Sequence, residues 1–206
     1  MTDGIEDKVL GRYLGLMKEI RMRVEVVRDI HLKRTEIKYL INNFELAYIQ
    51  IRKIIEVILM APILVNEEEY RKVSKNPEFD WRLKQICKYL LEVNDRYYPK
   101  PIWVESKGGK GDIFHNVESG FPSSDQLLEI YDYANDFMHF QNPLRTQGPL
   151  DADKEWKYIV ESVNAINVLL NTHLAYPVAE GRFYFITMET GKGEPGGNLF
   201  GIAENT

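Results

Sequence analysis

The chain has 206 residues, of which 44% are hydrophobic and 28% are charged, and its formal net charge is −5. These values are typical of a globular protein with a packed core, and they exclude a wholly disordered chain. The acidic balance argues against a broad surface that holds nucleic acid through its phosphates, but it is compatible with a small basic site on an acidic body.

Neither a metal nor a cofactor is predicted. Cys87 is the only cysteine, so an intramolecular disulfide and a cysteine-based metal cluster are both excluded. No two histidines lie at metal-ligand spacing on one predicted helix. The four histidines are scattered along the chain: His31, His115, His139 and His173.

The N-terminus is polar and acidic, without the basic and apolar regions of a signal peptide. The longest apolar stretch, 49–65, is interrupted by Arg52, Lys53, Glu56 and Pro62, which is typical of a buried helix and not of a membrane span. We therefore expect a cytoplasmic protein that does not enter a membrane.

Two long helices are predicted in the first part of the chain. Apolar residues recur every three or four positions over 5–32, which predicts an amphipathic helix with a charged solvent face. A second helix is expected from Thr35, as its N-cap, to about Met60, where Pro62 ends it. Its second half, 44–59, is apolar almost all the way round, as in the central helix of a bundle.

Shorter elements follow. Helices are expected at 67–74 and 80–93. Next, 102–104 and 113–115 flank Gly108-Gly109-Lys110-Gly111, which predicts a small β-hairpin or an ordered loop. The glycine run lacks the spacing and the following helix of a phosphate-binding loop, so we interpret it as a flexible turn.

The last helices have clear start signals. A capping box at Ser123 and Gln126 begins a helix that must end by Asn142-Pro143. Asp151 caps a final long helix that runs to about His173.

Alternating residues at about 182–204 predict a terminal β-hairpin with a long turn. Repeats and linkers are not evident, so 1–206 is predicted to be one helical domain. The predicted fold class is mainly α, a helical bundle with small β-hairpin additions that include the C-terminal hairpin.

Arg52 and Glu56 lie four residues apart on the apolar helix, so they share a face and cannot both point into open solvent. One interpretation is a partly buried ion pair that sets the register of the helix. The other is that Glu56 holds Arg52 toward a polar cleft, where the guanidinium contacts a phosphate bidentately.

His139 lies in the last turn of the helix that Ser123 begins, and Asn135 lies one turn earlier on the same face. A helix C-terminus favours the charged imidazolium, and histidine is suited to general acid–base chemistry near neutral pH. The alternative is a histidine that caps its own helix or is hydrogen-bonded in the core.

Three short segments resemble a bacterial family of helical proteins. That family carries an Arg-x-Ile-Ile-Glu helix and a Leu-His-x-x-Asn-Pro segment, in which this chain has Met138 in place of the leucine. The resemblance covers roughly 44–143 and the terminal hairpin. It rests on Ile51-Arg52-Lys53-Ile54-Ile55-Glu56, Asn94-x-x-Tyr97-Tyr98-Pro99 and Phe137-Met138-His139-Phe140-Gln141-Asn142-Pro143.

More remotely, the helical layout is similar to the HEPN superfamily, many of whose members are RNases, toxins or phage-defence components and are often dimeric. Its Arg-polar-x-x-x-His motif matches Asn135 and His139, but Ala134 stands where the arginine is expected. The resemblance implies metal-independent RNA cleavage with His139 as general acid/base and Asn135 in a positioning role. Arg52, oriented by Glu56, would then contact the phosphate.

The departure at Ala134 favours a different hypothesis, a non-catalytic HEPN-like interaction module of a defence or toxin–antitoxin system. The RNase that uses His139 is the alternative. With either hypothesis we expect a homodimer formed through apolar helix faces, and an RNA or protein partner. Geometry separates the two hypotheses, because the enzyme needs Arg52 and His139 close together in an open cleft.

Overall fold

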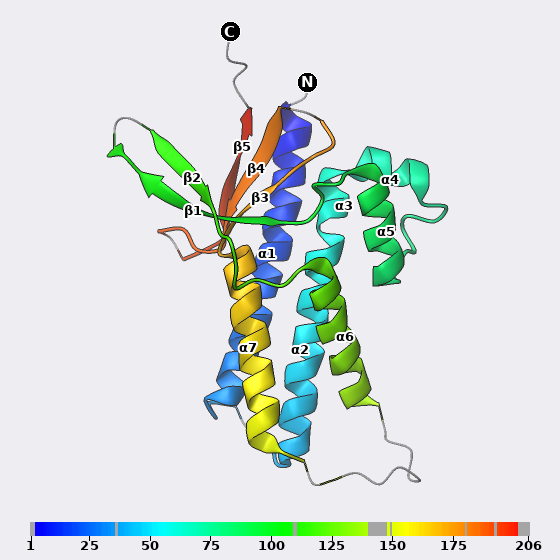
Figure 1. Ribbon diagram of the computed structural model, residues 1–206, viewed down its shortest axis with the longest axis vertical. Helices are drawn as coiled ribbons and strands as arrows, with labels where there is room; N and C mark the ends of the chain where they lie inside the picture. Colours follow the sequence, from blue (N-terminus) through cyan, green and yellow to red (C-terminus); the bar gives the residue numbers. More distant parts are fainter. Residues whose placement is uncertain are drawn as a thin grey trace.

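The computed structural model describes residues 3–35, 37–108, 111–139, 148, 150–179, 181–191 and 193–201. Four long helices lie side by side, and a twisted sheet sits at one end of them (Figure 1). They are α1 (Asp3–His31), α2 (Leu40–Met60), α6 (Ser124–Met138) and α7 (Ala152–Leu170). The short helices α3 (Pro62–Val65), α4 (Glu67–Val73) and α5 (Leu83–Val93) lie beside the C-terminal end of α2, at the same end of the molecule as the sheet.

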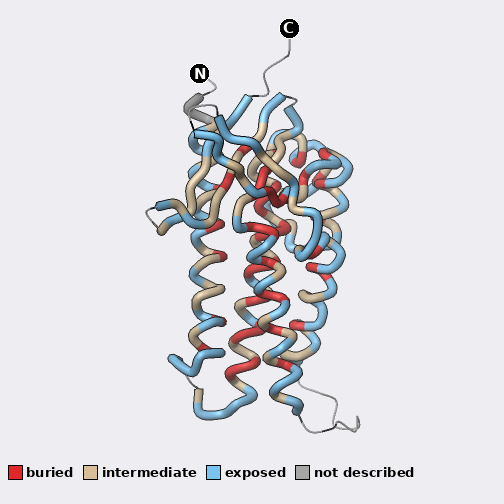
Figure 2. The backbone as a smooth tube through the Cα atoms, turned by 60° about the vertical axis from the view of Figure 1, so that its left-hand side comes forward, coloured by how far each residue is buried: buried red, intermediate tan, exposed pale blue. Residues whose placement is uncertain are grey.

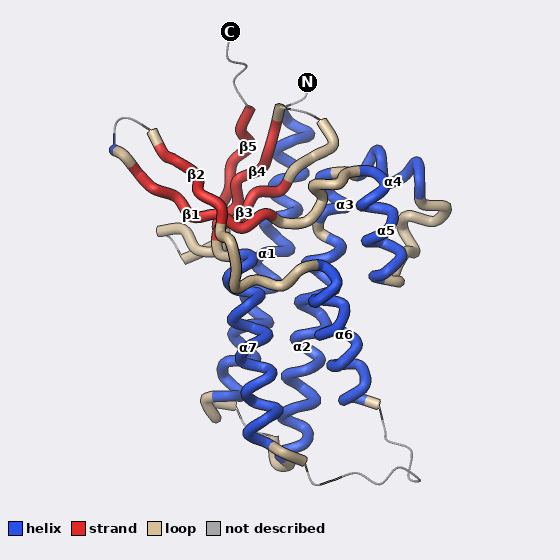
Figure 3. The backbone as a smooth tube through the Cα atoms, in the orientation of Figure 1, coloured by secondary structure: helices blue, strands red, loops and turns tan. Residues whose placement is uncertain are grey.

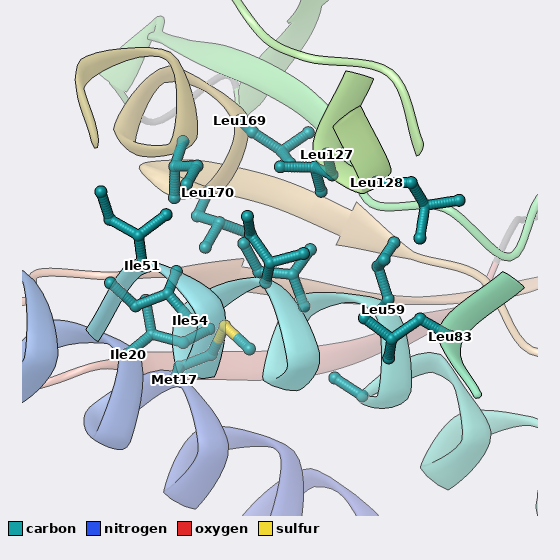
Figure 4. Close-up of a cluster of buried hydrophobic side chains, with 14 of the residues drawn as sticks. Met17, Ile20, Ile51, Ile54, Leu59, Leu83, Leu127, Leu128, Leu169 and Leu170 are labelled. Carbon is teal, nitrogen blue, oxygen red and sulfur yellow. The ribbon is translucent and has the colours of Figure 1, made fainter. Parts of the chain in front are cut away.

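Helix α2 is the central helix, as its apolar composition predicts, because it contacts α1, α5, α6 and α7. The buried residues form a column inside the helical layer (Figure 2). Figure 4 shows how side chains from these helices meet, with Ile51 and Ile54 of α2 beside Met17 and Ile20 of α1. Among the described residues, no helix combines the length and the apolar character needed to cross a bilayer.

The N-cap predicted for the second helix is wrong by four residues. Helix α2 begins at Leu40 after Tyr39, and Thr35 is not its N-cap. The side chain of Asn43 explains the delay. Its Oδ1 accepts from the Ile37 N–H and its Nδ2 donates to the Ile37 carbonyl, both at 3.0 Å, so the chain before Leu40 is held in a non-helical conformation.

The strands form one five-stranded sheet in the order β2-β1-β3-β4-β5, with antiparallel neighbours throughout (Figure 3). The two predicted hairpins are present within it, although residues 202–204 of the terminal one lie outside the described part of the chain. The strands are β1 (Lys100–Ser106), β2 (Asp112–Asn116), β3 (Thr172–Ala175), β4 (Arg182–Thr187) and β5 (Gly196–Gly201).

The predicted fold class, mainly α with separate small hairpins, is therefore wrong, and the chain has a mixed α/β fold. The difference comes from β3. The last long helix was expected to reach about His173, but α7 ends at Leu170. The next residues pair on both sides, His173 with Pro101 of β1 and with Ile186 of β4, and so join the two hairpins into one sheet.

The sheet is curled, and its two faces are both apolar. Tyr184 and Ile186 of β4 are buried in the core shared with the helices, while the alternate residues of β4 point to the other face. On that face Phe114 of β2 stacks on Phe185 with ring centroids 5.3 Å apart, although β1 and β3 separate the two strands. Such a contact requires strong curling, so this half of the sheet encloses a second small cluster of aromatic rings.

Candidate functional site

The structure brings Arg52 and Glu56 together and adds Tyr131 of α6 to the pair. Arg52 Nη2 lies 3.4 Å from Glu56 Oε1 and 3.2 Å from the Tyr131 hydroxyl oxygen, and that hydroxyl donates to Glu56 Oε1 at 3.3 Å. Lys53 Nζ donates to the other carboxylate oxygen at 2.8 Å. Glu56 thus receives three donors, and the cluster joins α2 to α6.

The guanidinium of Arg52 also lies over the ring of Tyr131. Its guanidinium carbon lies 5.1 Å from the centroid of the Tyr131 ring, a cation–π distance, and about a third of the side chain is exposed. Its Nε is buried and has no hydrogen-bond partner among the described residues. The ion pair that sets the register between helices fits this geometry better than an arginine extended toward a ligand.

His139 lies away from that cluster. It is the exposed C-cap residue of α6, eight residues beyond Tyr131, which corresponds to about 12 Å along a helix axis. Asn135 is half-buried one turn earlier, and its carbonyl accepts from the His139 backbone N–H at 3.2 Å. The structure therefore brings the side chains of Arg52 and Glu56 together, links Asn135 and His139 through a backbone bond of the helix alone, and does not bring the two pairs into one cleft. Residues 140–143 of the His-x-x-Asn-Pro segment lie outside the described residues.

A buried polar cluster that sequence reasoning missed joins α2, α6 and α7. Glu155 is 8% exposed, and both its oxygens accept hydrogen bonds. The Tyr48 hydroxyl donates to Oε2 at 2.5 Å, and the Tyr133 hydroxyl lies 3.0 Å from Oε1 and 3.2 Å from Oε2. Burial, and then the bond to Glu155, raise the pKa of Tyr48 well above its ordinary value.

One signal in the sequence points to this cluster. At the predicted helical spacing, Glu155 falls on the same stripe as Ile159, Val163 and Ile166, which are buried. A carboxylate on a buried stripe must be satisfied by donors from another element. Glu155 also lies in the first turn of α7, where the helix dipole favours a negative charge. Glu155 and Tyr48 are buried and only Tyr133 reaches the surface, so we interpret the cluster as structural.

His173 is a second buried polar residue, and it replaces the expected end of the last helix. It is 0% exposed. Its Nδ1 lies 2.9 Å from the Leu170 carbonyl oxygen, and its Nε2 lies 3.1 Å from the Tyr13 hydroxyl. Burial lowers the pKa of His173 to about 4, so the ring is neutral at physiological pH. It ties β3 to α1 and α7.

A groove of about 890 Å³ lies between α5 and α6. The floor is largely apolar, while the two walls carry opposite charges. Lysines come from α5 and carboxylates from α6, and the Lys84 Nζ to Asp132 Oδ2 ion pair crosses the groove at 2.9 Å. The floor includes Cys87, Leu91, Tyr98, Phe121 and Leu128, and the walls include Lys84, Lys88, Asp125, Glu129 and Asp132.

The single cysteine does not make this groove reactive. Burial raises the pKa of the Cys87 thiol, even though a hydrogen bond from Tyr97 acts in the opposite direction. Burial also raises the pKa of Tyr97 to about 12. Both groups are therefore neutral near pH 7, and the groove is suited to contact and not to nucleophilic chemistry.

Within the described ranges, no group of three or more His, Cys, Asp or Glu side chains is arranged to hold a metal ion. Comparisons of the chain with protein-family models, with curated proteins and with solved structures find no match.

Proposed function

We propose that the protein is a non-catalytic interaction module whose α5–α6 groove binds an amphipathic helical segment of a protein partner. The observation that carries the proposal is the apolar floor between walls of opposite charge. Leu91 on this floor is 58% exposed and lies beside the other apolar groups of the groove. A helix in the groove would cover it.

The charges of the walls define the partner. Acidic side chains along one edge of the bound helix would face Lys88, and basic side chains along its other edge would face Glu129 and Asp125. The same carboxylates repel phosphate groups, and the chain as a whole carries a net charge of −5. Peptide is therefore favoured over RNA at this surface.

The contacts of Arg52 favour this proposal over RNA cleavage. Catalysis by His139 needs a cationic group beside the imidazole to hold the phosphate. Arg52 is bound to Glu56 and Tyr131 at a different level of α6, and Ala134 is wholly buried at the motif position of the arginine. From the resemblance to the HEPN superfamily we further propose that this interaction module belongs to a bacterial defence or toxin–antitoxin system.

The test is selection from a displayed library of amphipathic helical peptides on the purified full-length chain. We expect enriched peptides with apolar residues three and four apart, acidic on one edge and basic on the other. The Leu91→Glu variant should bind them at least about tenfold more weakly, because a charge replaces a central apolar contact. The matched control is Leu40→Glu, which changes a leucine of similar exposure (51%) at the start of α2.

Two results would overturn the proposal. The first is a wild-type chain that enriches no such peptide, or one whose selected peptides bind Leu91→Glu equally well. The second is cleavage of mixed tRNA and mRNA in EDTA that disappears in His139→Ala. That result would replace the interaction module with the metal-independent RNase.

A further inference from the structure

Helix α1 has a solvent face with an unusual order of side chains. The helix packs on α2, α3 and β5 through residues such as Tyr13, Met17 and Ile20, and the opposite face is open. On this open face Met22 is 54% and Val26 is 38% exposed, and they border a hollow of about 410 Å³ shared with α2. Large apolar side chains therefore stand exposed along the second half of α1.

The first half of the same face contains two glycines, which have no side chain. Gly11 and Gly15 are exposed, and a Cβ added at either one would meet no atom within 4 Å. Packing within the chain therefore does not require glycine here, although glycine is a poor residue for the interior of a helix. Bare backbone of this kind permits the close approach of a second helix.

The two glycines and the two large apolar residues are placed symmetrically about the midpoint between Lys18 and Glu19. Gly15 and Met22 lie equally far from that midpoint on either side, and Gly11 and Val26 do too. In an antiparallel pair of identical helices, each such position faces its counterpart on the partner. Met22 of one copy would then lie over Gly15 of the other, and Val26 over Gly11.

The charges follow the same order. Lys18 of one copy would meet Glu19 of the other at the crossing point, and Lys8 and Asp29 are also equally far from the midpoint. Lys18 pairs with Glu194 within the chain at 3.1 Å, but more than half of each side chain is exposed, so this pair is weak. Glu19 accepts from Arg23 through Oε1 at 2.6 Å, so the partner's Lys18 would contact its other oxygen, Oε2. A parallel arrangement would instead set glycine against glycine and lysine against lysine.

We infer that this face of α1 binds a second copy of the chain, with the two α1 helices antiparallel and crossing at Lys18 and Glu19. The interface covers about 22 Å of helix from Gly11 to Val26. It lies on α1 and α2, apart from the α5–α6 groove, so the two binding activities are independent.

The first test is sedimentation velocity of the full-length chain from low to high micromolar concentration. Wild type should form a species of twice the 24.1 kDa chain mass. Met22→Glu should weaken association by at least about tenfold, because a symmetric dimer contains the change twice. The matched control Phe79→Glu, at a 79% exposed residue between α4 and α5 that lies on neither binding surface, should leave association unchanged.

Gly15→Ala separates the interface from a simple effect on folding. Since no atom lies within 4 Å of the added Cβ, alanine should raise the melting temperature of the dilute monomer. The same methyl group should weaken the dimer, because it occupies the place of the partner's Met22. A monomeric wild type, or a dimer unaffected by both α1 variants, would overturn the inference.

Disulfide trapping fixes the orientation. In a Cys87→Ser background, chains carrying Gly15→Cys are mixed with chains carrying Met22→Cys and are then oxidised. The antiparallel pair predicts a covalent heterodimer, because these two positions face each other within disulfide reach. Homodimers of Met22→Cys alone would indicate a parallel pair and would overturn the orientation.

Discussion

His173 should make the stability of this protein depend on pH. The ring is wholly buried, and a carbonyl oxygen can only accept, so Nδ1–H must donate to Leu170 and Nε2 must accept from the Tyr13 hydroxyl. A second ring proton would displace the bond from Tyr13 and place a charge in the core. Burial accordingly lowers the pKa of His173 to about 4 from its ordinary value of 6.5.

The sign and size of the effect follow from these two values. Between them the unfolded chain binds a proton that the native chain does not, so the contribution to stability is complete above pH 6.5 and decreases as the pH falls toward 4. The total loss is about 3 kcal/mol, and about 2 kcal/mol of it falls between roughly pH 7 and roughly pH 5.

The assay is urea unfolding of wild type and His173→Gln near pH 7 and near pH 5, followed by tryptophan fluorescence. The variant should be less stable near pH 7, because it loses ring contacts and hydrogen bonds. Between the two pH values, its free energy of unfolding should nevertheless fall by about 2 kcal/mol less than that of wild type. Subtracting one change from the other cancels the contributions of the other titrating groups. His139→Gln, which removes an exposed imidazole, is the control. Equal pH dependence in wild type and His173→Gln would refute the reasoning.

Three further substitutions test the contacts of the core and the sheet by chemical denaturation at neutral pH. Tyr48→Phe should cost about 2 kcal/mol, because it removes a buried donor to Glu155, and a cost near zero would mean that this bond is not made. Ser123→Ala should cost about 1 kcal/mol through loss of the capping box, and an unchanged midpoint would contradict that role. Gly197→Ala should cost about 1–3 kcal/mol, because the new Cβ would lie 2.5 Å from the Phe185 carbonyl oxygen; a neutral effect would show that the strands separate easily.

The elements that local sequence predicts are those whose signals lie within a few residues. The capping box at Ser123 sets the start of α6, and the helical periodicity of α1 and the apolar composition of α2 predict both long helices. Strand β3 has no comparable signal. Thr172–Ala175 directly follows an apolar helical stripe, and its strand conformation depends on partners about 70 residues earlier and on β4. Helical periodicity assigned the first residues of this segment to the last helix, but pairing with β1 and β4 makes them a strand.

The polar sites were predictable to different degrees. The contact of Arg52 with Glu56 follows from helical spacing, but the addition of Tyr131 depends on how α6 packs across α2. Glu155 can be recognised as a carboxylate on a buried stripe, whereas its two tyrosine donors come from other helices. The groove is the most difficult to predict from the sequence, because it depends on how far apart α5 and α6 pack on the surface of α2.

The position of β3 makes the sheet part of the core and not an addition to the bundle. Helix α7 ends at Leu170, and strand β3 begins at Thr172. Within this strand, His173 is hydrogen-bonded to Tyr13 of α1. Asn94, just after α5, connects the other side, because its Nδ2 donates to Asn66 Oδ1 at 3.0 Å and to the Tyr176 carbonyl at 2.9 Å. Disruption of His173 therefore loosens helices and strands together, and we expect one cooperative unfolding transition, equal by far-UV circular dichroism and by tryptophan fluorescence.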